Sequence, residues 1–150
     1  LIMKMMPKQA EFREIPDKSN RIKYGEYMIT AAACSDCHTP LEKGQPVFDL
    51  AFSGNREFMI PTGGTVRSAN ISSDVNTGIG SWSKEHFVAK FKKYADSNFV
   101  FENINQNDFN TIMPWKKYSG MTEDDLGAIY DYLMTTKPVS KRVLRFTPSN

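Results

Sequence analysis

The chain has 150 residues, of which 40% are hydrophobic and 24% charged, and this composition excludes a disordered or fibrous protein. The 19 basic and 17 acidic residues leave a net charge of only +2, so we expect no nucleic-acid partner held through phosphate neutralisation. Two cysteines are too few for a disulfide-dense scaffold, and no apolar run is long enough for a membrane-spanning segment.

The chain divides into three parts along its length. Residues 1–18, with two prolines among mixed charges, predict an extended arm. The arm opens on Leu1 and lacks the pattern of a signal peptide, so we expect a mature or trimmed form. Residues 19–136 are predicted to form one domain, and residues 137–150, with four basic side chains, a basic tail.

Three segments of the middle part carry helical signals. A capping Ser or Asn precedes a helix over about 20–33, although Gly25 in its middle costs about 1 kcal/mol relative to alanine. A second capped segment, 83–94, places aromatic residues at i, i+4 and i+7. The third helix, from Thr122 to about residue 136, begins with three acidic residues at the positive end of the helix dipole.

Two long segments show neither a helical nor a strand period. Residues 39–80 contain nine glycines and prolines, and so long an irregular segment in a compact domain is expected to wrap a bound group. Residues 96–112 are rich in asparagine and predict mostly loop, with at most one helical turn.

The strongest chemical signal is the run Cys34-Ser35-Asp36-Cys37-His38, which lies directly after the first predicted helix. C-x-x-C-H is the attachment motif of a c-type haem. Two thiols at this spacing can add to the two vinyl groups of one porphyrin, and the adjacent histidine can offer a neutral imidazole nitrogen to the iron. We therefore predict one covalently bound haem c, with Cys34, Cys37 and His38 as cofactor-binding residues.

Two other uses of the cysteine pair are less well supported. A structural zinc site needs four ligands, but the chain has no second cysteine pair and His86 is its only other histidine. A thioredoxin-like dithiol needs a βαβ pattern, whereas the motif follows a predicted helix and precedes a loop.

The iron of such a haem commonly takes a methionine opposite the histidine as its second axial ligand. Met113 is the best candidate because Pro114 biases it to an extended conformation in a loop just before the last helix. Met59, Met121, His86 and an open site remain alternatives. The predicted metal ligands are thus His38 and Met113.

The chain resembles bacterial class I c-type cytochromes, especially the single-haem domains of periplasmic dehydrogenase cytochrome subunits. The resemblance covers most of residues 20–136 and is carried by the haem motif and several short runs. These runs are Gly25-Glu26-Tyr27, Phe52-Ser53-Gly54, Ala69 to Asp74, Thr77 to Ser83, Met113-Pro114-Trp115 and Met121 to Leu133.

The resemblance implies an all-α class I cytochrome c fold, in which the N- and C-terminal helices cross and long loops wrap the haem. A glycine of the first helix meets an aromatic residue of the last, here Gly25 with Tyr132 or Tyr130.

The resemblance also implies roles for residues around the haem. A proline carbonyl commonly holds the proximal imidazole, which makes Pro46 a candidate. The resemblance also supports His38 and Met113 as axial ligands. It further suggests Asn70 and Trp82 near the haem propionates; a plain core position is the other interpretation of Trp82.

The predicted function is one-electron transfer by a His/Met-ligated haem c between periplasmic redox partners such as a dehydrogenase, an oxidase or another cytochrome. The protein is expected to be an electron carrier rather than an enzyme, and to be periplasmic or otherwise exported. Two alternatives remain: a haem-based sensor with a labile sixth ligand, and the electron-accepting module of a dehydrogenase complex.

Because the haem propionates bring the net charge of the protein closer to zero, docking of a partner would depend on local patches of charge. The candidate patch is Lys90, Lys92, Lys93, Lys116 and Lys117.

Overall fold

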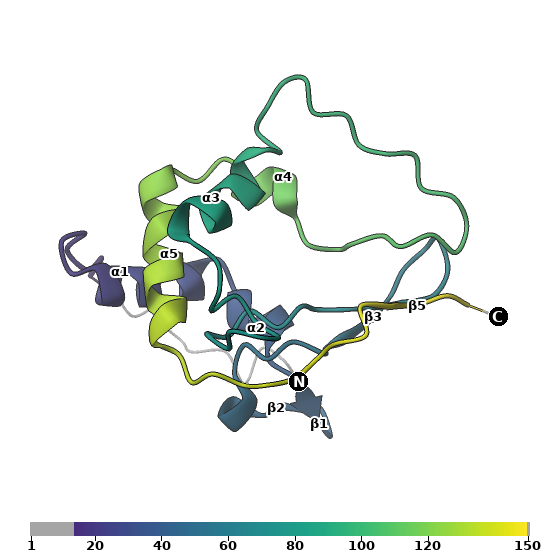
Figure 1. Ribbon diagram of the computed structural model, residues 1–150, viewed down its shortest axis with the longest axis horizontal. Coiled ribbons are helices and arrows are strands. Elements are labelled where there is room, and N and C mark those ends of the chain that lie inside the picture. Colours follow the sequence, from purple (N-terminus) through teal and green to yellow (C-terminus); the bar gives the residue numbers. More distant parts are fainter. Residues whose placement is uncertain (1–13, 150) are drawn as a thin grey trace, which may run out of the picture.

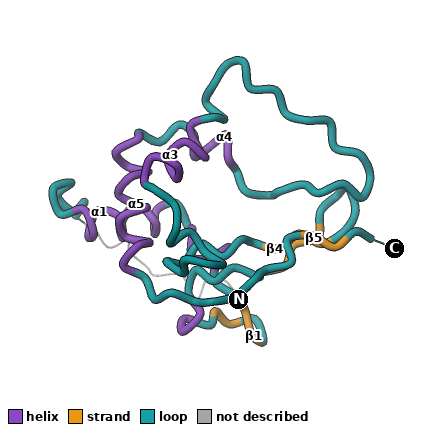
Figure 2. Tube along the Cα trace, viewed as in Figure 1, coloured by secondary structure: helices purple, strands orange, loops and turns teal. Residues whose placement is uncertain are grey.

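The computed structural model describes residues 14–149, so most of the predicted arm lies outside the described residues. Helices dominate one half of the fold, and short strands and loops form the other (Figures 1 and 2). Within this range no helix is long and apolar enough to cross a membrane. The α-helices are α1 (Arg21–Ala31), α2 (Cys34–His38), α3 (Lys84–Lys92), α4 (Trp115–Tyr118) and α5 (Glu123–Thr135).

The predicted helix starts are confirmed by their capping hydrogen bonds. Asn20 caps α1, Ser83 caps α3 and Thr122 caps α5, each through a side-chain oxygen that accepts from a backbone N–H three residues on. The predicted apolar faces of these helices then meet in one core. The buried members of this core are Ile29, Phe52, Ile79, Phe87, Ile129 and Leu133.

Helices α1 and α5 cross, as expected (Figure 1), and Gly25 of α1 lies at the crossing. A Cβ atom on Gly25 would lie 2.9 Å from the Tyr132 Cβ and would overlap the backbone carbonyl of Ala128. Tyr132 is therefore the aromatic partner at the crossing. Tyr130 instead donates a 2.6 Å hydrogen bond to the carbonyl of Trp82, which ties α5 to the segment before α3.

Two small antiparallel sheets make the all-α expectation incomplete. In one, β1 (Leu41–Glu42) pairs with β2 (Gln45–Pro46). In the other, β4 (Thr65–Arg67) lies between β3 (Glu57–Met59) and β5 (Phe146–Thr147). The pairing of Val66 with Phe146 joins the wrapping segment to the C-terminal tail. Strands of two or three residues show too little alternation of apolar and polar side chains to be predicted, and β5 in addition pairs with a strand about 80 residues earlier.

The asparagine-rich segment forms a wide loop between α3 and α4, as predicted, and contains no helical turn (Figures 1 and 2). Its start is anchored by aromatic stacking, since Tyr94 lies 5.2 Å from the Trp115 ring and 4.7 Å from the Phe99 ring. Beyond this anchor its apolar side chains are exposed, and Val100 retains 81% of its accessible surface.

A polar cluster links α1 to the first turn of α5. Asp125 accepts hydrogen bonds from the Tyr24 hydroxyl at 2.6 Å and from the Lys18 ammonium at 3.1 Å. Burial works to raise the pKa of Asp125, but the hydrogen bonds from Tyr24, Thr122 and Lys18 outweigh it and lower the pKa to about 2. The ionised carboxylate is therefore the form that stabilises the helix crossing.

Substitution Asp125→Asn should lower the free energy of unfolding at pH 7 by about 1–2 kcal/mol. Because the folded-state pKa lies below the ordinary 3.8, the carboxylate's contribution is present above about pH 4 and is lost as the pH falls toward 2. The difference between the two proteins in urea unfolding should therefore shrink between pH 5 and about pH 2.5. Asp124→Asn is the control, because Asp124 pairs with Arg21 on the surface and such pairs contribute about 0–1 kcal/mol. Equal losses of unfolding free energy in the two variants would contradict the stabilising role of the ionised Asp125 carboxylate.

Candidate haem site

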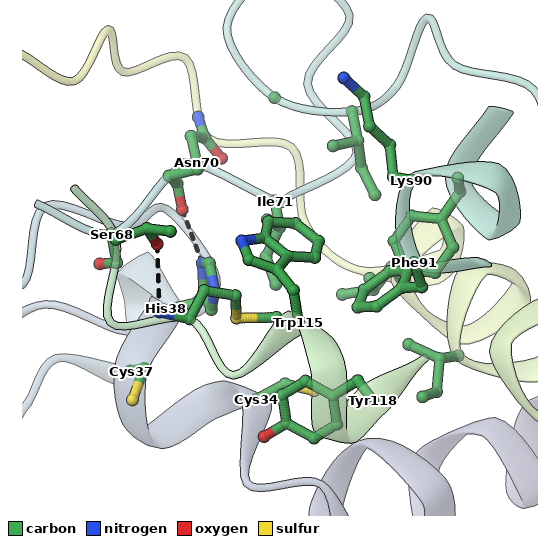
Figure 3. A pocket seen from close by; sticks show the side chains of 18 of the residues that line it. Cys34, Cys37, His38, Ser68, Asn70, Ile71, Lys90, Phe91, Trp115 and Tyr118 are labelled. Atoms are coloured by element: carbon green, nitrogen blue, oxygen red, sulfur yellow. Dashed lines mark hydrogen bonds between the residues drawn. The ribbon is translucent and has the colours of Figure 1, made fainter. Parts of the chain in front are cut away.

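The C-x-x-C-H segment forms a separate short helix because the chain turns sharply after α1. Ala33 adopts the left-handed conformation with φ of 53°, and α2 begins at the next residue. The Tyr118 hydroxyl of α4 donates a 2.7 Å hydrogen bond to the Ala32 carbonyl and fixes this corner. The one turn of α2 brings Cys34, Cys37 and His38 to the same side of the fold (Figure 3).

His38 is held in the state that a metal ligand requires. Its side chain is buried, and Nδ1 lies 2.8 Å from the Ala69 carbonyl oxygen, which can only accept. Nδ1 therefore carries the proton and Nε2 keeps its lone pair. Burial lowers the pKa of His38, with the charge of Arg145 acting in the same direction and the Ala69 hydrogen bond opposing both. The imidazole is thus neutral at pH 7.

The carbonyl that orients His38 belongs to Ala69, so the suggestion of Pro46 was wrong. Pro46 lies in the exposed β1–β2 hairpin, paired with Leu41. The Ala69 carbonyl reaches the imidazole because neighbouring segments are fastened there: Gly54 N–H donates to the His38 carbonyl, and Asn55 N–H donates to the Ser68 carbonyl.

A cavity of about 650 Å³ opens beside the imidazole and the two thiols. Its volume lies within the usual range for cofactor sites, and its walls combine apolar side chains with cations. Trp115 and Tyr118 of α4 reach toward this space, and Phe91 and Lys90 of α3 face it from another side (Figure 3). A large, mostly apolar planar group can therefore be enclosed between α2, α3 and α4.

The cysteines suit covalent attachment to a neutral group. Both are free, and both line the cavity. Burial raises the pKa of the Cys34 thiol to about 12, so it is uncharged at neutral pH in an apolar setting. A thioether is equally uncharged and removes only a weak S–H donor. The residues present thus fit a haem bound through Cys34 and Cys37.

The candidate axial ligands differ in position. Met113 lines the cavity and is half-buried, with its backbone N–H donating to the Thr111 hydroxyl at 3.1 Å. Met121 also lines the cavity, but it packs against the hydrophobic core at the start of α5. Met59 is 89% exposed on β3 and does not line the cavity. His86 is exposed, as expected, and packs edge-on against Trp82.

Asn70 and Trp82 both line the cavity, but Asn70 has an additional role that the sequence did not indicate. Its amide nitrogen donates to the carbonyls of Val139 and Lys141 at 2.8 and 3.2 Å. Its amide oxygen accepts from the backbone N–H and the hydroxyl of Ser72. Asn70 therefore fastens the C-terminal tail to the edge of the cavity.

Several cavity residues were missed by sequence reasoning. Tyr118 lies on helix α4, which the sequence did not predict, and Arg142 and Arg145 lie in the tail predicted to follow the domain. Pro114 followed by Trp115 could have indicated a short helix, because proline is favoured at helix starts. The tail had no such signal, because its place depends on contacts with residues about 70 positions earlier.

Crossed terminal helices, a C-x-x-C-H turn with an oriented neutral histidine and an adjoining apolar cavity define the class: a domain that encloses one covalently bound haem c. Comparison with known proteins agrees. A sequence model of the family described as "Cytochrome c" matches residues 22–137. The chain belongs to the cytochrome c family.

The chain is also similar to cytochrome subunits of bacterial dehydrogenases. It is 33% identical over 122 residues to the alcohol dehydrogenase (quinone) cytochrome c subunit of Gluconobacter oxydans, covering 79% of this chain and 22% of that protein. It is 31% identical over 113 residues to the gluconate 2-dehydrogenase cytochrome c subunit of Pantoea cypripedii, covering 75% and 22%. A fructose dehydrogenase cytochrome subunit of Gluconobacter japonicus is 30% identical, covering 79% and 22%. The chain thus spans about a fifth of the length of these relatives.

Proposed function

We propose that this domain relays single electrons through a six-coordinate haem c whose axial ligands are His38 and Met113. The observation that carries the proposal is the His38 side chain, which is buried and neutral and keeps Nε2 free while Ala69 holds Nδ1. When bound, the haem supplies an iron that alternates between the ferric and ferrous states. The protein's part is to exclude water, fix the ligands and leave one edge accessible to a partner.

Support for Met113 comes from its position and from what surrounds it. It lines the same cavity as His38, and its neighbours on both sides restrict it. Thr111 accepts the Met113 backbone N–H, and Pro114 begins the turn into α4. A methionine held in this way adds little reorganisation when the iron changes oxidation state, which suits electron transfer better than ligand binding.

Asn70 and Trp82 are proposed to lie at the propionate edge of the haem. The Trp82 ring has Lys90 at 5.5 Å from its centroid, and its own carbonyl is held by Tyr130. These contacts hold Trp82 beside the cavity. The indole N–H can only donate a hydrogen bond, and a propionate carboxylate would be a suitable acceptor for it.

Redox partner proteins of an exported electron-transfer chain are the proposed partners, since the relatives are named as dehydrogenase cytochrome subunits. The domain would act as a shuttle or as the electron-accepting module of such a complex. The predicted lysine patch needs revision as a docking surface, because Lys92 donates to the carbonyls of Ser119 and Met121. Lys90 and Lys93 line the cavity and remain the best-placed cations for steering a partner toward the haem.

The test is a spectroscopic comparison of the full chain, produced with its haem, before and after carbon monoxide is added at pH 7. We expect a pyridine haemochrome typical of covalent haem c and a ferrous spectrum that carbon monoxide leaves unchanged. Ready binding of carbon monoxide would refute the six-coordinate relay and favour the sensor with a labile sixth ligand. Release of haem by acidified organic solvent would refute covalent attachment.

A further inference from the structure

The C-terminal segment 139–147 crosses one edge of the haem cavity and is fastened there at two places. At its start, the Val139 and Lys141 carbonyls accept from Asn70, and the Lys141 N–H donates to the Thr77 hydroxyl at 2.9 Å. At its end, β5 pairs with β4. Figure 1 shows the segment running from the end of α5 to β5, opposite α3 and α4. This stretch is therefore a strap over the cavity.

The cavity that this strap borders has a strongly biased charge. Five cationic side chains line it, and within the described part of the chain no aspartate or glutamate does. Two of the five are Lys90 of α3 and Lys93, the residue that follows this helix. The other three lie on β4 or the strap, and they are Arg67, Arg142 and Arg145. An apolar cavity with this rim fits a ligand that has an apolar body and an anionic edge.

The three arginines differ in how their charges are satisfied. The Arg67 guanidinium pairs with the Glu57 carboxylate at 2.8 Å. Arg145 donates through Nε to the Arg67 carbonyl at 2.9 Å, which fixes its position and leaves its terminal nitrogens for another acceptor. Among residues 14–149, neither Arg142 nor Arg145 lies within 4.0 Å of a carboxylate. Two guanidinium groups at the cavity thus have no anionic partner in the described chain.

Haem has the matching charges. The thioethers to Cys34 and Cys37 take up the two vinyl groups, which lie on two adjacent pyrroles, and the two carboxylates of the porphyrin lie on the other pair. We propose that the strap is a propionate clamp, in which Arg142 and Arg145 bind the two haem carboxylates and raise the reduction potential. This inference rests on the haem-binding function proposed above. It concerns residues beyond position 137, where the family match ends.

The clamp makes a prediction about the potential because cations beside the propionates favour the more negative, ferrous haem. Double substitution Arg142→Gln with Arg145→Gln should lower the ferrous-to-ferric ratio at a fixed applied potential about tenfold, which is about 59 mV for a one-electron couple. The matched control is Lys137→Gln with Lys141→Gln, which removes two charges from the same tail at side chains that do not line the cavity. We expect the control to shift the ratio less than twofold.

A conservative variant separates charge from structure. The double substitution Arg142→Lys with Arg145→Lys keeps both charges. Its ferrous-to-ferric ratio at the same applied potential should therefore stay within twofold of the parent ratio. If the glutamine double variant does not fold, the single variants Arg142→Gln and Arg145→Gln should each lower the ratio about threefold. The clamp would be overturned if the glutamine variants of Arg142 and Arg145 fold and shift the ferrous-to-ferric ratio no more than the control Lys137→Gln with Lys141→Gln does. A parent protein without covalent haem in the pyridine assay would instead overturn the proposed function, so the two failures are distinguishable.

Discussion

Replacing Gly25 with alanine adds one methyl group, and we expect it to destabilise this protein more than the addition of a methyl group at any other position of α1. The new Cβ would overlap the Ala128 carbonyl and the first side-chain atom of Tyr132, and neither can move without shifting α5. Adding volume to a packed site typically costs 1–3 kcal/mol, and a backbone obstacle places this case at about 3 kcal/mol or more. The gain in helix propensity from glycine to alanine, about 1 kcal/mol, is smaller than this cost.

The matched control lies across the same crossing. At Gly127 a Cβ would be 3.4 Å from the Arg21 guanidinium and 3.5 Å from the Lys84 side chain, and both side chains can shift. Gly127→Ala should therefore leave stability unchanged or raise it by up to about 1 kcal/mol. Thermal unfolding of the haem-loaded proteins, followed at the haem absorption band, measures both variants. Equal unfolding midpoints for the two would refute the close crossing at Gly25.

Local sequence signals predicted the helical half of the fold well. The caps at Asn20, Ser83 and Thr122 act within three residues of themselves, so the chain around each cap contains all the information that it needs. The C-x-x-C-H motif is equally local, because one turn of α2 places both thiols and the imidazole. Those features could be predicted before any tertiary contact was known.

The remaining features depend on distant contacts. The imidazole of His38 is oriented by the Ala69 carbonyl, which lies 31 residues away in the chain. Nothing in the sequence around Ala69 distinguishes its carbonyl from the other backbone carbonyls. Asn70 was predicted near the haem edge, but its role in fastening the tail depends on Val139, 69 residues later. Strand β5 exists only through its pairing with β4. Such contacts are set by the packing of the whole domain rather than by local preference.

The substitution Met113→Ala should change the haem more than any other methionine replacement. If the Met113 thioether is the second axial ligand, its loss leaves an open or water-filled position and removes the ligand that raises the reduction potential. We expect the ferrous variant to bind carbon monoxide at pH 7. We also expect its ferrous-to-ferric ratio at a fixed potential to fall at least about tenfold, or about 59 mV. Folding should survive, because the ligand loop lies outside the buried core.

Two further methionines make the test of Met113 discriminating. Met59→Ala alters an exposed side chain away from the cavity and should change neither the spectrum nor the potential. Met121→Ala removes a cavity-lining side chain that also packs on the core, so it should lower the unfolding temperature without opening the iron to carbon monoxide. If Met121→Ala rather than Met113→Ala opens the iron, the axial ligand lies at the start of α5. The loop before α4 would then cover the haem without binding its iron. The comparison decides between the two methionines, because only removal of the residue that binds the iron opens the iron to carbon monoxide.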